Sequence, residues 1–164
     1  MIVIAVGERI HNPKLSARAE ARLAADWKPM LSPALRVVSS TRTRWLAVGG
    51  DRVSYMFNLL PPCATSGAWN AALATKHAEE MLSYAADQHM QYGAPENARL
   101  VLLGRKVERA FTDAPRQWGT VYVVDGIDCT TLPHPSGRCR VWNDTQAHAR
   151  LRRALIEFCA EVKR

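Results

Sequence analysis

One histidine stands in a stretch whose residue types suit proton donation beside a phosphate. Residues 131–140 read Thr-Leu-Pro-His-Pro-Ser-Gly-Arg-Cys-Arg. The two prolines stiffen the backbone around His134, because each fixes its own φ and pushes the preceding residue toward extended geometry. A histidine on a stiff loop, followed by arginines, can place a proton donor together with a phosphate or groove contact. The competing interpretation is a Pro/Gly-rich surface turn with solvated arginines. The candidates in this loop are His134, Ser136, Gly137, Arg138 and Arg140.

Two further loops carry polar side chains that a ligand can use. Residues 7–13, Gly-Glu-Arg-Ile-His-Asn-Pro, follow an apolar run, and ligands of open α/β sheets collect outside the carboxyl ends of strands. The polar members of this loop are Glu8, His11 and Asn12. Asn58 is a carboxamide in an otherwise apolar run, and a buried amide needs hydrogen-bond partners or is left free to bind a ligand edge. Each of these residues taken singly also suits a role in stabilising its own loop.

The hydrophobic pattern predicts the elements that must position these loops. Continuous β-branched and apolar runs predict buried strands, and apolar residues at three- and four-residue spacing predict helices. The predicted strands are residues 2–6, 57–60, 100–104, 121–124 and 128–132, and the predicted helices are residues 15–27, 41–48, 67–90, 105–111 and 144–162. Strands that alternate with helices predict an α/β sandwich with a mainly parallel sheet. The helix start after Gly104 offers free N–H groups, and Arg105 there would strengthen binding of a phosphate.

Composition narrows the class of protein. The 164 residues are 48% hydrophobic and 23% charged, which is typical of one globular domain over residues 1–164. The formal net charge of +7 favours a polyanionic partner. No apolar run approaches the roughly 20 residues that span a bilayer, and the opening residues lack the basic leader of a signal peptide. Four widely spaced cysteines predict reduced thiols, a cytoplasmic location and neither zinc nor an iron–sulfur cofactor.

Taken together, three loops resemble those of the uracil-DNA glycosylase superfamily. They are the glycine loop of residues 7–13, the run Phe-Asn-Leu-Leu-Pro-Pro at residues 57–62, and His-Pro-Ser-Gly at residues 134–137. The resemblance covers nearly the whole chain in order, and its specificity rests on the last two motifs together. It implies a three-layer α/β/α sandwich around a mainly parallel four-stranded sheet, and a monomer that acts without a cofactor on DNA, in a bacterial cell or as a viral protein in the host cytoplasm.

The resemblance also implies a role for each site residue. His134 would donate to the pyrimidine 2-oxo group, while Asn58 would read the edge of the flipped base in a pocket shared with Gly7, His11 and Phe57. The water-positioning residue is Asn12 or Glu8; the family places an acid or amide soon after the loop glycine, and Asn12 is preferred because Pro13 accompanies it. Ser136, Gly137, Arg138, Arg140 and Arg105 would contact DNA. All of this requires Asn58 and His134 to converge beside the Gly7 turn.

Three alternatives stay open. The same fold can act on a modified pyrimidine, since the first loop departs from the family pattern. A protein with this pocket can also bind DNA without catalysis. A third reading is a basic α/β protein that binds a small phosphorylated ligand at the helix start after Gly7 or Gly104.

Overall fold

The computed structural model describes residues 2–25, 27, 32–33, 39–64, 69–91, 98–136 and 138–160. Within these residues the chain forms one six-stranded sheet in the order β2-β3-β1-β4-β6-β5. The strands are β1 (Ile2–Gly7), β2 (Ser32–Pro33), β3 (Tyr55–Asn58), β4 (Ala98–Leu103), β5 (Val121–Val124) and β6 (Ile127–Leu132). The protein is therefore of the α/β class that the sequence predicts.

Four parallel strands form the centre of the sheet, and one antiparallel strand lies at each edge. β3, β1, β4 and β6 are neighbours in parallel pairing, whereas β2 pairs antiparallel with β3 and β5 pairs antiparallel with β6. The expected count of four strands is thus wrong for the sheet as a whole and right for its parallel part. β5 runs antiparallel because the two-residue turn Asp125-Gly126 joins it to β6, with φ of 48° and 81°, the positive values that a tight hairpin requires.

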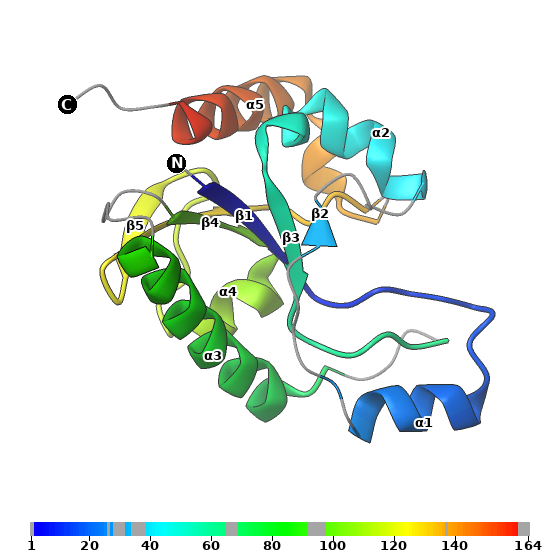
Figure 1. The fold of residues 1–164 in the computed structure, drawn as a ribbon. Helices are drawn as coiled ribbons and strands as arrows, with labels where there is room; N and C mark the ends of the chain where they lie inside the picture. The colour runs from blue at the N-terminus through cyan, green and yellow to red at the C-terminus, as the bar shows by residue number, and fades with distance from the viewer. Residues whose placement is uncertain are drawn as a thin grey trace.

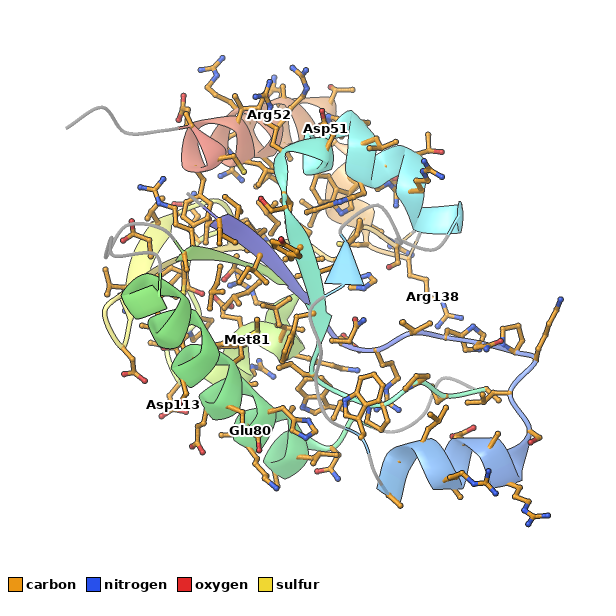
Figure 2. All side chains as sticks on the ribbon, in the orientation of Figure 1. Asp51, Arg52, Glu80, Met81, Asp113 and Arg138 are labelled. Atoms are coloured by element: carbon orange, nitrogen blue, oxygen red, sulfur yellow. The ribbon has the colours of Figure 1, made fainter. Side chains whose placement is uncertain are left out.

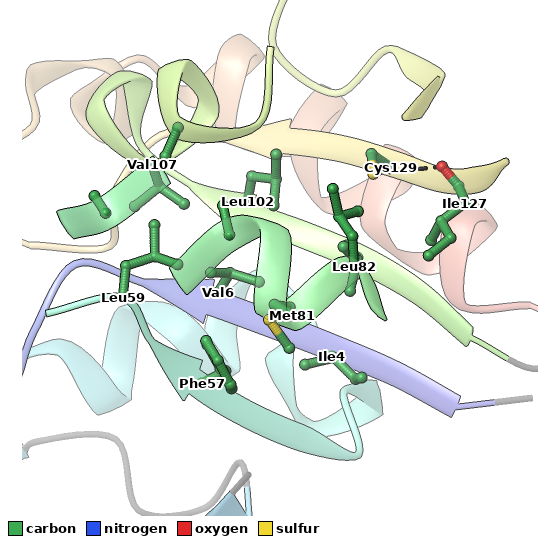
Figure 3. Packing of buried hydrophobic residues seen from close by; sticks show 14 of the residues in the cluster. Ile4, Val6, Phe57, Leu59, Met81, Leu82, Leu102, Val107, Ile127 and Cys129 are labelled. Atoms are coloured by element: carbon green, nitrogen blue, oxygen red, sulfur yellow. Dashed lines mark hydrogen bonds between the residues drawn. The ribbon is translucent and has the colours of Figure 1, made fainter. Parts of the chain in front are cut away.

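Helices cover both faces of the sheet (Figure 1). α3 (Ala71–Gln91) and α4 (Arg105–Phe111) lie on one face, while α2 (Ser39–Ala47) and α5 (Thr145–Cys159) lie on the other. The pleat of β1 separates the two cores, since Ile4 and Val6 pack under α3 (Figure 3) and Val3 and Ala5 pack under α5. This arrangement agrees with an α/β/α sandwich, because successive side chains of a buried strand point to opposite faces.

Helix α1 (Ala17–Ala25) differs from the other helices, because none of its residues is buried. It stands apart from the sheet at the end of a long loop that leaves β1 (Figure 1).

The strand that carries Asn58 lies two residues earlier than predicted. It spans Tyr55–Asn58 and not residues 57–60, so Asn58 is the last residue of the strand. Leu59 and Leu60 remain buried because the chain continues beside the loop after β1, with their N–H groups donating to the carbonyls of Gly7 and Glu8 at 3.0 and 2.8 Å. Apolar character alone did not distinguish the strand from this buried continuation.

Candidate active site

The candidate residues follow the carboxyl ends of neighbouring parallel strands. Asn58 ends β3 and lies opposite Gly7, the last residue of β1. Gly104 follows β4, and its N–H donates to the carbonyl of Leu132 at the end of β6, at 2.8 Å. His134 follows two residues later. The order β3-β1-β4-β6 therefore brings Asn58, Gly7, Gly104 and the His134 loop to the carboxyl ends of the central strands, where α/β proteins bind ligands.

Gly7 makes room for the Asn58 side chain. A Cβ atom at Gly7 would lie 2.7 Å from Asn58 Oδ1, so any side chain at this position would displace the amide. Asn58 is half-buried, and no hydrogen bond to another part of the described chain occupies its amide. A half-buried amide at the end of a strand can read the polar edge of a ligand.

His134 is held by its own loop in one defined state. Its Nδ1 accepts a hydrogen bond from the Ser136 N–H at 3.2 Å, and its carbonyl accepts one from Trp142 Nε1 at 2.9 Å. Burial lowers the pKa of His134 below its usual value of 6.5, and the Glu8 carboxylate opposes this effect. The imidazole is therefore neutral at pH 7, and because Nδ1 accepts, the proton is on Nε2. His134 can donate that proton to an oxygen that gains negative charge.

Asn58 and the His134 loop lie on the same face of the sheet. Phe57 points into the core under α3, so the pleat turns Asn58 toward the α2 and α5 face. The His134 carbonyl is bonded to Trp142, which belongs to the core under α2 and α5. The backbone of the His134 loop therefore packs on the face of the sheet toward which Asn58 points.

Glu8 lies at the carboxyl end of β1, beside the candidate site, whereas Asn12 lies farther along the loop. Glu8 directly follows the end of β1 and acts electrostatically on His134. The Asn12 side chain accepts from the Lys14 N–H at 3.1 Å, and its own N–H donates to Cys63 at 2.9 Å. Asn12 thus stabilises an exposed turn five residues beyond the strand, and the preference for Asn12 over Glu8 is reversed by this geometry.

His11 also serves the loop. Its Nε2 contacts the Ala64 carbonyl at 2.7 Å, in an exposed segment where residues 8–12 and 60–64 run side by side. The prediction that His11 contributes to a base pocket is not supported by this position.

Phe57 was predicted near a flipped base, and the structure contradicts this. Its side chain is 4% exposed and belongs to the core under α3, on the same face as Met81 (Figure 3). Because apolar residues alternate between two buried faces in a central strand, the sequence pattern could not say which face Phe57 takes.

The arginines predicted to contact DNA divide into two groups. Arg138 and Arg140 are exposed, and Arg138 points away from the sheet into the space beside α2 (Figure 2). Arg105 is already engaged: it donates to Glu108 Oε2 and the Arg116 carbonyl at 2.5 Å each, and its guanidinium lies 3.7 Å from the Trp118 ring centroid. Arg105 therefore stabilises the fold and is not a free phosphate contact. Gly137 lies outside the described residues.

Three residues that support the His134 loop were missed at the sequence level. Arg44 Nη1 donates to the Ser136 carbonyl at 2.5 Å across 92 residues of sequence, and Trp142 holds the His134 carbonyl. Glu108 is fully buried and bonded to Thr131 in β6, three residues before His134. Nothing in a local pattern marks such long-range partners, although a glutamate within the apolar face of residues 107–111 is a signal that could have drawn attention.

The comparison with known proteins finds no relative. No protein-family model matches the chain, and no curated protein matches its sequence.

Among the described residues, no three His, Cys, Asp or Glu side chains gather as metal ligands would. Within the same part of the chain, no helix has the length and apolar character needed to cross a bilayer. The fold and the site define an α/β protein with a candidate ligand site at the carboxyl edge of its parallel strands.

Proposed function

We propose that this protein is a DNA glycosylase of the uracil-DNA glycosylase type, which hydrolyses the bond between deoxyribose and uracil or a related pyrimidine. The observation that carries the proposal is the placement of the Asn58 carboxamide beside Gly7 at the end of β3, and of a neutral Nε2–H donor, His134, in the loop that follows the carboxyl end of β6. Three strand spacings separate Asn58 from the end of β6 at Leu132, or about 14 Å between backbones at about 4.8 Å each, and His134 follows two residues later. In the proposed complex the planar base lies between the Asn58 and His134 side chains.

In the proposed reaction Asn58, His134 and Glu8 each have one role. A base within a duplex is inaccessible, so the nucleotide must be flipped into the site. The Asn58 amide pairs with the edge of the flipped base. His134 Nε2–H donates to the base oxygen on which negative charge develops as the glycosidic bond breaks. A preorganised donor of this kind contributes about 3–4 kcal/mol.

Glu8 is the group we assign to the water. Its carboxylate can orient a water molecule toward the sugar and stabilise the positive charge on the oxocarbenium-like transition state, as carboxylates do in glycoside hydrolysis. Asn12 would have to leave its turn to take this role. Because Glu8 also acts on His134, its charge belongs to the same electrostatic environment as the donor.

Contacts to DNA come from the His134 loop. Ser136 lies beside the donor, and the exposed Arg138 and Arg140 follow within four residues. Their cationic side chains suit the phosphates on either side of the extruded nucleotide, or the gap that it leaves. The net charge of +7 favours the encounter with DNA. A monomer remains our expectation.

Single-turnover excision from a uracil-containing oligonucleotide tests the proposal. Compared with the wild type, His134→Ala should slow base release by about a hundredfold to a thousandfold. Asn58→Ala should abolish discrimination between pyrimidines. Glu8→Gln should slow the reaction, whereas Asn12→Ala, the matched control in the same loop, should leave the rate nearly unchanged. Undiminished cleavage in both His134→Ala and Asn58→Ala would remove this site assignment.

The same assay separates the alternatives. Release of several modified bases with none of uracil would keep the fold and change the substrate. DNA binding with a steep salt dependence but no release of any base would favour a non-catalytic DNA-binding protein. Stabilisation by a free nucleotide with indifference to DNA would favour a small-ligand protein.

A further inference from the structure

A basic arm extends from the candidate site and adds nothing to either core. The arm is residues 9–25, the loop after β1 together with α1. None of the nine α1 residues is buried, and no arm residue belongs to either hydrophobic cluster. Figure 1 shows α1 apart from the sheet and its covering helices. An ordered segment that buries so little contributes little to folding, so its sequence is free to serve another purpose.

Polar contacts fix the arm to the loop after β3. The Cys63 N–H donates to the Ile10 carbonyl at 3.1 Å, and the Asn12 N–H donates to the Cys63 carbonyl at 2.9 Å. At Ala64 the N–H donates to Glu20 Oε2 at 2.9 Å, and the carbonyl contacts His11 Nε2 at 2.7 Å. The loops after β1 and β3 therefore leave the edge of the sheet together, and α1 is held at the far end of that extension.

The charge of the arm is strongly one-sided. Residues 9–25 hold four basic side chains and one acidic side chain, and the acidic one, Glu20, is engaged with the Ala64 N–H. Lys14, Arg18 and Arg22 are exposed, and Arg18 and Arg22 share one helix face because they are four residues apart. The net result is a cationic surface whose carboxylate is already committed.

We propose that the arm binds the sugar-phosphate backbone of DNA, as a second contact separate from the His134 loop. The choice of DNA as the partner rests on the proposed function. The choice of phosphate as the group that is bound rests on the positive charge of the arm. The arm begins at Arg9, directly after the site residue Glu8. A duplex bound at the carboxyl ends of the strands therefore lies next to the start of the arm. Lys14, Arg18 and Arg22 then pair with phosphates and release their counterions, which strengthens binding without reading the sequence.

The test compares two double variants that each remove two exposed positive charges. Arg18→Gln/Arg22→Gln alters the arm. Arg152→Gln/Arg153→Gln removes two arginines that are also exposed from α5, a helix at the opposite end of the molecule from α1 (Figure 1). The probe is an undamaged duplex, with the dissociation constant measured over a range of salt concentrations. Each lost phosphate contact lowers the slope of log K against log salt by about 0.9, so the arm variant should lose about 1.8 and bind at least about tenfold more weakly at 0.1 M salt.

The control variant should keep the wild-type slope, and both variants should keep the wild-type melting temperature. Equal losses in the two variants would mean that only net charge matters, and an unchanged slope in the arm variant would overturn the proposal directly. Binding of the arm to anionic phospholipid vesicles, with no effect of the arm variant on DNA binding, would assign it to a membrane surface and also overturn it.

Base release is measured separately, so that the two proposals fail separately. Release from saturating uracil DNA should stay at the wild-type rate in the arm variant, while the DNA concentration for half-maximal rate rises. A wild type that releases no base, combined with a reduced salt slope in the arm variant, would refute the glycosylase and leave the arm as a DNA contact.

Discussion

The buried carboxylate of Glu108 gives the most quantitative prediction for this fold. Glu108 is 0% exposed. Its Oε1 accepts from Thr131 Oγ1 at 3.0 Å and from the Arg116 N–H at 2.9 Å, and its Oε2 accepts from Arg105. Tyr122 Oη lies 2.6 Å from the same Thr131 hydroxyl. One threonine therefore connects a buried charge on α4 to both strands of the β5–β6 hairpin.

Replacing Thr131 with valine removes the hydroxyl while keeping nearly the same shape. The buried carboxylate then loses one of its three donors, and a hydrogen bond to a charged group contributes about 1.5–3 kcal/mol. The Tyr122 hydroxyl, half-buried with its pKa raised by burial to about 12, loses its partner as well. We therefore expect Thr131→Val to lower the free energy of unfolding by about 2–3 kcal/mol.

The preceding residue supplies a matched control. Thr130 is also buried, at 1% exposed, but its hydroxyl donates to the neutral Thr120 carbonyl at 3.1 Å. Thr130→Val should therefore lower the free energy of unfolding by about 0.5–1.5 kcal/mol. Equilibrium unfolding in urea at 25 °C measures both values, and the melting temperatures should fall by about 2–4 °C for each kcal/mol. A loss in Thr131→Val no larger than that in Thr130→Val would refute the assigned role of the carboxylate.

Three further predictions concern the site and its supports. NMR titration of His134 should give a midpoint below pH 6.5, with the proton on Nε2 at neutral pH. Because folding lowers the pKa of His134, the wild type should lose folding free energy as the pH falls below 6.5, where the unfolded chain binds the proton more readily. His134→Gln should therefore lose less free energy of unfolding than the wild type between about pH 7.5 and 5. Gly7→Ala should change the free energy of unfolding little, because the Asn58 amide stands at the end of a flexible side chain and can move away from the new Cβ. The same movement should weaken ligand binding, and a crystal structure with Asn58 unmoved would contradict this. Arg105→Ala should cost more stability than Arg109→Ala, an exposed neighbour on α4, because Arg105 pairs with the buried Glu108 and stacks on Trp118; calorimetry of the two variants tests the order.

Local patterns predicted the elements well wherever one force decided the structure. Residues 2–6 and 100–103 are continuous apolar runs, and only a central strand covered on both faces accommodates them. The helix at residues 105–111 was predicted to the residue, because Gly104 and the apolar spacing set both of its ends. β2 escaped prediction, since two residues have no periodicity, and Ser32–Pro33 reads as a connector.

The candidate site was less predictable because its geometry depends on contacts distant in sequence. The sequence placed Glu8 and His134 after strands and Asn58 within one, but it could not show that Gly7 accommodates the Asn58 amide. It favoured Asn12 for the proline beside it, whereas the chain beyond Glu8 pairs with residues 60–64 and carries Asn12 away. Arg105 looked available because a sequence does not reveal that Glu108 and Trp118 receive its guanidinium.

The independence of α1 from both cores has a consequence for how this protein can change. Replacing or shortening α1, or changing its charges, removes no buried residue from the fold. The affinity for a polyanion can therefore change while Asn58 and His134 stay in place. Under the proposed DNA contact, replacing α1 would change the affinity for DNA while Glu8, Asn58 and His134 keep the positions that the strands give them.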